Sequence, residues 1–301
     1  MRTCHHATAP QPGRHGGRRA FTITELLMVI GVIALLISIL TPSVLQVKNV
    51  ARTAKTRAQL KVFSDALEMF YGNHVVGGDY PPSYWDSSGA NNNPYADISQ
   101  VSGPKNSYAA QGAQTLVWAL AGADLLGTPG FVQDQMKTRY ALNNGKPAFL
   151  RQGPIVDLTK VKIANPSASI MRTNFSPQPS AAVPVFPDAF GMPVLYYRAV
   201  KAPDGTPTYY PDDNLAFRDG HNTDGLVHPI YSGNDNNNKK INGLTAFETY
   251  TKNFQITAAY QPHNPDTFLL ISAGVDGRYG TVDDVTNYPL LTENCPHEFM
   301  P

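Results

Sequence analysis

Residues 20–27 read AFTITELL, and an apolar run follows them as far as Leu40. Ser38 is the one polar residue between Leu26 and Leu40. Counted from Phe21 the run is 20 residues long, the length that a helix needs to cross a bilayer. Glu25 is the single carboxylate in the run, and a carboxylate is costly in lipid, which makes it a candidate functional residue. These residues predict an N-terminal membrane-spanning helix to which the rest of the chain is attached.

Residues 1–20 are predicted to be an unstructured leader, since they are polar, lack periodicity, and hold four arginines and no acid. A secretory signal peptide has a shorter apolar core, and small residues at its cleavage site follow that core. Here the small residues precede the apolar run, so we expect any processing on the leader side. Basic clusters flank the run on both sides, so the positive-inside rule leaves the topology open.

The pattern beyond Pro42 predicts that the helix continues and becomes amphipathic. Apolar residues recur at three- and four-residue steps with basic residues between them: Val44, Val47, Ala51, Ala54, Ala58, Val62, Ala66 and Phe70. Gly72 and Asn73 are typical stop signals. We expect one helix over residues 21–73, membrane-spanning to about residue 41 and roughly 75 Å long at about 1.5 Å per residue. A signal anchor followed by an ordinary core helix would give a similar pattern.

Residues 74–301 are predicted to form a single α+β domain, an antiparallel sheet with large loop insertions at 84–185 and 201–265. Strands are expected at 194–200 and 268–272 and in the segment 167–172, and a helix at 111–126. Charged residues make up only 16% of the chain; without the leader, 20 basic and 23 acidic residues remain, a net charge of −3. No basic face for nucleic acid is indicated. Cys295 would be the one cysteine left, so no internal disulfide is expected.

The strand predicted at 268–272 leads into AGVDGRYGTVDD, residues 273–284. Asp276, Asp283 and Asp284 lie there among three glycines. Carboxylate and carbonyl oxygens are the ligands that Ca²⁺ prefers, and a divalent cation removes the repulsion between neighbouring carboxylates. The sequence therefore indicates a structural Ca²⁺ site at these three aspartates, with a solvated turn as the alternative.

A second polar segment, residues 219–225 followed by His228, holds two aspartates, a histidine and two glycines, and we interpret it as a turn rather than a metal loop. The chain carries no nucleophile elbow, phosphate-binding loop, paired cysteine motif or His-Glu-x-x-His helix. We therefore expect that the protein is not an enzyme.

The segment FTITEL at 21–26, the apolar run and Pro42 together resemble the N-terminus of type IV pilins and type II secretion pseudopilins. Three further segments are similar to pseudopilin features: the Tyr-Pro turn at 78–82, the proline-bounded hairpin at 188–197 and the aspartate loop at 273–284. The resemblance implies that a prepilin peptidase cuts between Ala20 and Phe21 and methylates Phe21. The family has glycine where this chain has Ala20.

The resemblance also implies a location and a function. The leader would lie in the cytoplasm, one helix would cross the inner membrane, and residues 74–301 would lie in the periplasm or outside. Glu25 would pair with the Phe21 amine of a neighbouring subunit, so the partners would be other pilin or pseudopilin subunits. The implied function is that of a structural subunit of a type II secretion pseudopilus. Alternatives are a minor pilin of a type IV pilus, or an extracytoplasmic enzyme or binding protein that uses only the anchor.

Overall fold

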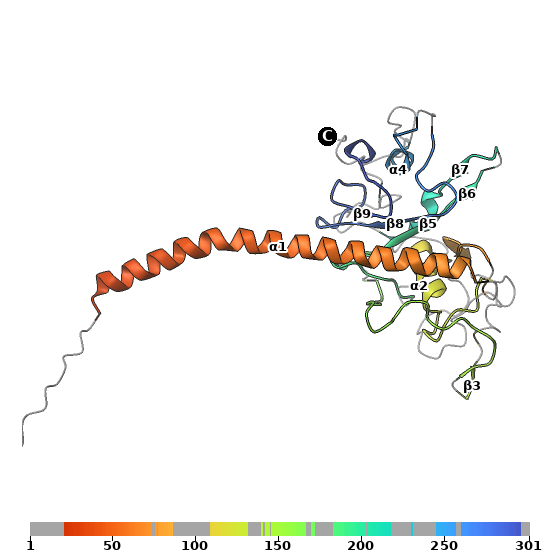
Figure 1. Ribbon diagram of the computed structural model, residues 1–301, viewed down its shortest axis with the longest axis horizontal. Coiled ribbons are helices and arrows are strands. Elements are labelled where there is room, and N and C mark those ends of the chain that lie inside the picture. Colours follow the sequence, from red (N-terminus) through yellow and green to blue (C-terminus); the bar gives the residue numbers. More distant parts are fainter. Residues whose placement is uncertain are drawn as a thin grey trace, which may run out of the picture. The chain divides into compact units, whose positions relative to one another are not determined.

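The computed structural model of the chain describes residues 21–73, 76, 78–86, 109–131, 140, 142–144, 146–166, 170–171, 183–202, 204–217, 230, 245–256 and 260–295. The chain divides into two compact units, Met1–Lys48 and Asn49–Pro301. The boundary between them lies inside the long helix α1 (Ile23–Tyr71), so the second unit begins with the second half of this helix. The predicted α+β layout is confirmed at this level: a long N-terminal apolar helix precedes a domain with small antiparallel sheets (Figure 1).

The first part of α1 is apolar on every side, and all of its side chains from 21 to 48 are exposed. Pro42 lies within the helix and removes one backbone donor. Two hydroxyl groups that precede it donate to backbone carbonyls about one turn earlier: Ser38 to Leu35 O at 2.7 Å and Thr41 to Ile37 O at 2.8 Å. This part of α1 is long and apolar enough to cross a membrane, and it is the one such helix in the described part of the chain.

The second half of α1 packs into the domain through a face that the sequence pattern did not identify. The buried residues of α1 are Thr56, Leu60, Phe63, Ala66, Leu67 and Phe70. Of the predicted stripe, Ala66 and Phe70 are buried, but Ala51, Ala54, Ala58 and Val62 are exposed. The domain instead covers the neighbouring face, because that face carries the larger side chains, which remove more apolar surface from water.

Three antiparallel strands form the central sheet in the order β5 (Leu195–Arg198), β8 (Phe268–Ser272) and β9 (Val285–Thr286). Leu195 lies opposite Ile271, which in turn lies opposite Thr286. All five residues of β8 are buried, as expected for a central strand covered on both faces. Tyr196, Phe268 and Leu270 face the core that includes α1, and the alternate residues face a second core.

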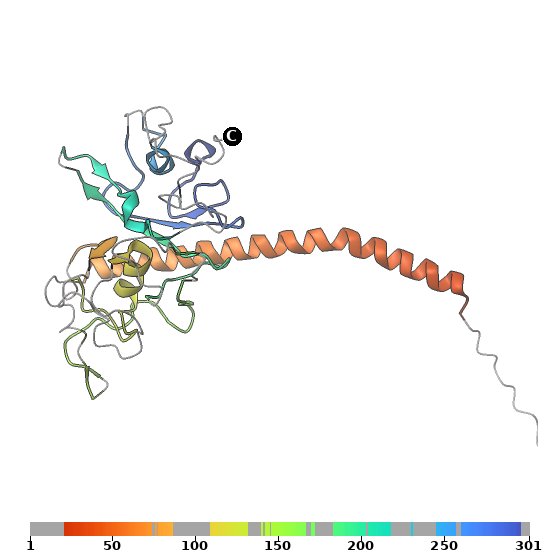
Figure 2. The same cartoon turned by 180° about the vertical axis from the view of Figure 1, so that it is seen from behind.

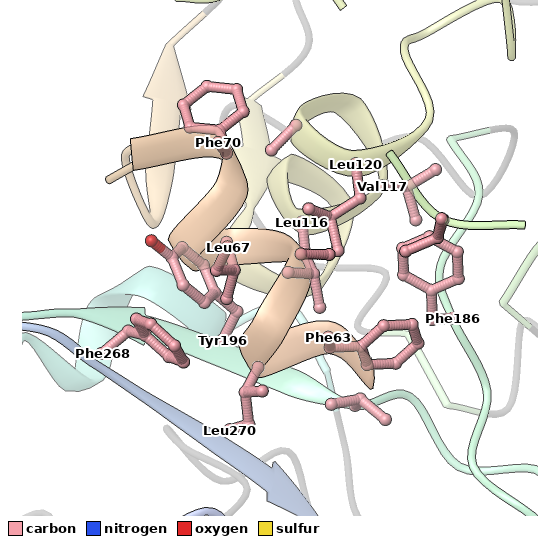
Figure 3. Packing of buried hydrophobic residues seen from close by; sticks show 14 of the residues in the cluster. Phe63, Leu67, Phe70, Leu116, Val117, Leu120, Phe186, Tyr196, Phe268 and Leu270 are labelled. Atoms are coloured by element: carbon pink, nitrogen blue, oxygen red, sulfur yellow. The ribbon is translucent and has the colours of Figure 1, made fainter. Parts of the chain in front are cut away.

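Helix α2 (Gly112–Leu120) belongs to the core shared with α1 (Figure 3). Figures 1 and 2 show the central sheet running along the second half of α1. The start of α2 lies against β5, since a Cβ at Gly112 would lie 2.0 Å from Tyr196 O. All nine residues of α2 are buried. The predicted helix at 111–126 is confirmed but is shorter, because Gly122 has a φ of +86° and a Cβ there would lie 2.1 Å from Gly127 O.

The remaining described elements are short, and all but Val200–Lys201 and Thr292–Asn294 lie within the regions predicted as insertions. They are β1 (Tyr84–Asp86) paired with β2 (Ala109–Gln111), β3 (Leu142–Asn143) with β4 (Lys146–Pro147), β6 (Val200–Lys201) with β7 (Pro207–Thr208), the 3-10 helices η1 (Pro211–Asn214) and η2 (Thr292–Asn294), and α4 (Ala246–Thr251). The predictions for residues 1–20, including Ala20, for residues 219–225 with His228, and for most of 167–172 lie outside the described residues.

The predicted hairpin at 188–197 is a turn organised by one buried carboxylate. Asp188 Oδ1 accepts hydrogen bonds from the amides of Phe190, Gly191 and Met192 at 2.7–2.9 Å. Its Oδ2 accepts from the hydroxyl of Ser272 on β8 at 2.6 Å. Burial raises the pKa of Asp188, and the four donors act in the opposite direction. One side chain therefore fixes the turn and attaches it to the sheet.

The same turn also contacts the second half of α1. Gln59 Nε2 donates to Pro187 O at 2.9 Å, and the amide of Ala189 donates to the hydroxyl of Thr56 at 3.3 Å. The turn thus links α1 to the central sheet through hydrogen bonds, beside the apolar core that joins them.

We expect Asp188→Ala to lower the free energy of unfolding by about 3 kcal/mol or more, because four donors lose their buried acceptor. For a domain of this size that is a fall in Tm of roughly 6–12 °C. Asp204→Ala is the matched control: Asp204 is exposed and accepts from one amide, that of Thr206 at 2.9 Å. Thermal unfolding of both variants, followed by circular dichroism, measures the difference; equal Tm values would contradict the role given to Asp188.

Candidate functional site

The start of α1 is a capping box built from Thr22 and Glu25. Glu25 N donates to Thr22 Oγ1 at 3.2 Å, and Thr22 N donates back to Glu25 Oε2 at 2.9 Å. The hydroxyl of Thr22 also donates to Glu25 Oε2 at 2.9 Å. This reciprocal pair satisfies two backbone donors that a helix start otherwise leaves free.

The capping box gives Glu25 a partner that the sequence prediction did not include. The resemblance implied a charge on another subunit as its partner, although Thr-x-x-Glu before an apolar run is a known N-terminal signature. The bonds to Thr22 occupy Glu25 Oε2, whereas Oε1 makes no hydrogen bond within the described residues. Glu25 can therefore cap its own helix and still offer one oxygen to another group. Phe21, the predicted processing residue, is exposed beside it.

The second candidate site is the loop 273–284 between β8 and β9. Asp283 Oδ2 accepts from the amides of Val275 and Asp276 at 2.6 and 3.0 Å, which holds the two ends of the loop together. Gly274 makes this approach feasible: its φ is +63°, and a Cβ there would lie 2.3 Å from Asp283 O. The loop is therefore closed by an aspartate at one end and a glycine at the other.

The other two predicted ligands are held differently. Asp276 Oδ1 accepts from the amide of Arg278 at 2.8 Å. Asp284 is 8% exposed, and its Oδ2 accepts from the amide of Gly280 at 2.7 Å and from the hydroxyl of Tyr250 at 2.5 Å. The structure thus brings the three aspartates into one loop, each bonded to donors within the protein.

The electrostatics of the loop disfavour three negative charges. Burial raises the pKa of Asp284 well above its usual value, and the charges of Asp283 and Asp276 act in the same direction. Burial and the charge of Asp283 also raise the pKa of Asp276. A divalent cation would remove both the repulsion and the cost of ionising Asp284.

The donor set suits Ca²⁺ in chemistry, since it consists of carboxylate oxygens beside exposed loop carbonyls. The three aspartate side chains, however, are not arranged around a common metal position. Within the described residues no group of three or more His, Cys, Asp or Glu side chains is arranged to hold a metal ion. A cation would require Asp276 and Asp283 to turn from their present amide donors toward a common point.

No protein-family model matches this chain, and neither the curated proteins nor the solved structures contain a match. The class that fold and sites define is therefore a coarse one: an α+β domain carried on a long, apolar N-terminal helix.

Asp284→Asn is expected to stabilise the metal-free protein at neutral pH. A carboxyl whose pKa is raised in the folded state adds stability at low pH, and this contribution is lost as the pH rises above the unfolded value of 3.8. Asparagine does not titrate and keeps an oxygen for Tyr250 and Gly280. At pH 7.5 and in the presence of a chelator, we expect the Tm of the variant to exceed that of the wild type by about 2 °C or more. This difference in Tm should shrink as the pH falls toward 4. A lower Tm for the variant at pH 7.5 would show that ionised Asp284 is not costly.

Proposed function

We propose that the protein is a structural subunit of a type II secretion pseudopilus. Its subunits would assemble through the apolar N-terminal helix after a prepilin peptidase cuts between Ala20 and Phe21. The observation that carries the proposal is the combination at the start of α1: a processing-type motif, a carboxylate, and an apolar helix exposed on every side. In this reading residues 1–20 stay in the cytoplasm, α1 spans the inner membrane, and the domain lies in the periplasm or outside.

The capping box supports a role for Glu25 in assembly. After cleavage Phe21 would carry a free amine one residue before Thr22. Glu25 Oε2 is occupied by Thr22, which leaves Oε1 for the amine of a neighbouring subunit. Each of the two charges is costly in lipid when alone, and pairing offsets that cost. A pair between subunits favours a staggered arrangement of helices over single subunits in the membrane.

The proposal is also supported by the face of the second half of α1 that the domain leaves uncovered. Ala51, Ala54 and Ala58 lie on it with Val62, which is 45% exposed, and Met69, which is 61% exposed. Small side chains let helices approach closely, and the exposed valine and methionine add apolar surface to bury. We propose that helices of neighbouring subunits cover this face in a filament.

The proposed Ca²⁺ would be held by Asp276, Asp283 and Asp284 and would stabilise the domain rather than take part in chemistry. When bound, it would neutralise the carboxylates of the loop. The loop resembles the pseudopilin calcium loop, and the hairpin at 188–197 resembles a second pseudopilin feature. A pseudopilin would have both the loop and the hairpin. An unrelated domain attached to the same kind of membrane anchor would not be expected to have both.

An anchored binding protein is the second candidate, and one observation favours it. A hollow of about 560 Å³ lies between the second half of α1 and the segments flanking β8 and β9. On α1 it is lined by the charged side chains Arg57, Lys61 and Glu68. Its other lining residues include Asn264, Asn287 and Tyr288. Its volume lies in the range of small-molecule sites. A binding protein of this kind would function without assembling, so assembly separates the two candidates.

Glu25→Ala and Glu25→Gln together test the assembly role. Glutamine can keep the capping box with Thr22 but carries no charge, whereas alanine loses both. We expect both variants to enter the membrane and both to fail to form filaments, because pairing requires the charge. The readouts are membrane fractionation and recovery of sheared filaments, with Thr24→Ala as the control. Filaments from Glu25→Gln at wild-type levels would refute pairing and leave Glu25 a helix cap only.

Calcium is expected to raise the Tm of the wild-type protein and a chelator to lower it. At a concentration 100 times the dissociation constant the gain is about 2.7 kcal/mol, or roughly 5–11 °C. Asp284→Asn should lose this response. A wild-type Tm that is the same in calcium and in chelator would contradict the calcium site. It would leave the proposed role of the N-terminal helix untouched.

A further inference from the structure

The hollow beside the second half of α1 is lined from that helix by one row of polar and charged side chains. They are spaced by four, three and four residues, which places them on the same face of the helix: Arg57, Lys61, Ser64 and Glu68. From the first to the last of them the row is roughly 16 Å long, at about 1.5 Å per residue. The row is therefore long enough to contact several groups of one ligand.

The charges of this row differ in whether they already have a partner. Lys61 pairs with the exposed Asp65 at 2.6 Å, and Glu68 accepts from the hydroxyl of Tyr80 at 2.9 and 3.1 Å. Arg57 makes no ion pair or hydrogen bond within the described residues. Its guanidinium is a planar fork of donors that matches a carboxylate or a phosphate. The hollow thus offers one positive charge that has no partner.

The segment before β8 brings an asparagine in an unusual backbone conformation to the same hollow. Asn264 has a φ of +50°, which is uncommon for any residue other than glycine. Its Nδ2 donates to Phe268 O at 3.2 Å, whereas its Oδ1 makes no hydrogen bond within the described residues. Residues in such conformations cluster at ligand sites, where the surrounding structure holds them in place. Asn264 therefore gives the hollow an acceptor without a partner.

Two hydroxyl groups and an apolar surface complete the lining. Ser64 and Thr267 are half-buried, and their hydroxyls make no hydrogen bond within the part of the chain that the structure describes. Leu60 and Phe268 also line the hollow and are 2% and 3% exposed, so they add buried apolar surface. A few polar groups around an apolar surface, in about 560 Å³, is the composition of a small-molecule site.

We propose that this hollow binds a small organic anion of the sugar-acid class, with a carboxylate bonded by Arg57 and hydroxyl groups bonded by Ser64, Asn264 and Thr267. Asn264 Oδ1 accepts from a ligand hydroxyl, and the two protein hydroxyls can donate or accept. The negative charge of Glu68 at the other end of the row directs the carboxylate of the ligand toward Arg57.

The inference goes beyond the proposed assembly and does not depend on it. A site in this hollow requires neither cleavage at Ala20 nor contact between subunits, so a filament subunit and an anchored binding protein could both carry it. The same chemistry is found in a free sugar acid and in the units of an acidic polysaccharide. The probes of the experiment therefore include both forms.

The experiment titrates galacturonate into full-length chains in detergent micelles and measures binding by calorimetry. We expect Arg57→Gln to bind roughly 10- to 100-fold more weakly than wild type, because it loses a charged hydrogen-bond donor. Thr267→Val, which keeps the shape of the side chain, should lose roughly 2- to 10-fold. Lys55→Gln is the matched control, since Lys55 is exposed on the same helix and does not line the hollow. Its affinity should equal that of wild type.

Three further probes test the class of ligand. Galactose has the hydroxyls without the carboxylate and acetate has the carboxylate without the hydroxyls, so each should bind roughly 10-fold or more weakly than galacturonate. A galacturonate trimer that binds more tightly than galacturonate would identify a polysaccharide as the source, and weaker binding of the trimer would identify the free acid.

Two results would overturn the inference: a wild type that does not bind galacturonate, or equal affinities of wild type and Arg57→Gln. Circular dichroism of each variant shows whether it is folded, which separates a lost contact from a lost structure. Recovery of filaments is scored separately, so a failure of the site and a failure of the proposed assembly are distinguishable.

Discussion

An apolar helix that is exposed on every side has to be covered, and this constraint governs the rest of the molecule. From Phe21 to Lys48 no side chain is buried, although most of the residues up to Leu40 are large hydrophobics. Leaving such surface in water costs about 25 cal/mol per Å². Lipid would remove this cost for a single chain, and neighbouring helices would remove it in the assembly that we propose.

The polar groups of α1 are arranged in ways that fit this constraint. Glu25 and Thr22 satisfy each other at the helix start, and hydroxyls near Pro42 satisfy carbonyls within the apolar part. Once the helix reaches Asn49 the domain takes over one of its faces. There Leu60, Phe63 and Leu67 enter a core with α2 and the central sheet, and the Asp188 turn adds hydrogen bonds to the same contact.

Those elements that follow from the pattern of neighbouring residues were predictable from the sequence. Length and hydropathy predicted the N-terminal helix, and the short apolar run Phe-Leu-Leu-Ile predicted β8 at 268–272. Pattern did not identify the packed face of α1, because Ala51, Ala54 and Ala58 continue the apolar periodicity while larger side chains on the neighbouring face carry the burial. The Tyr250–Asp284 bond joins residues 34 apart, and nothing local at either position indicates it. The capping box at Thr22 does follow a local pattern, Thr-x-x-Glu before an apolar run.

The central claim is that the segment at 20–27 is a processing site and an assembly joint rather than the start of a plain signal sequence. Intact-mass measurement of the protein extracted from membranes tests this most directly. We expect a chain that begins at Phe21, with residues 1–20 removed and one methyl group added. A chain that retains the leader, or one cut behind the apolar run so that the helix is lost, would contradict it.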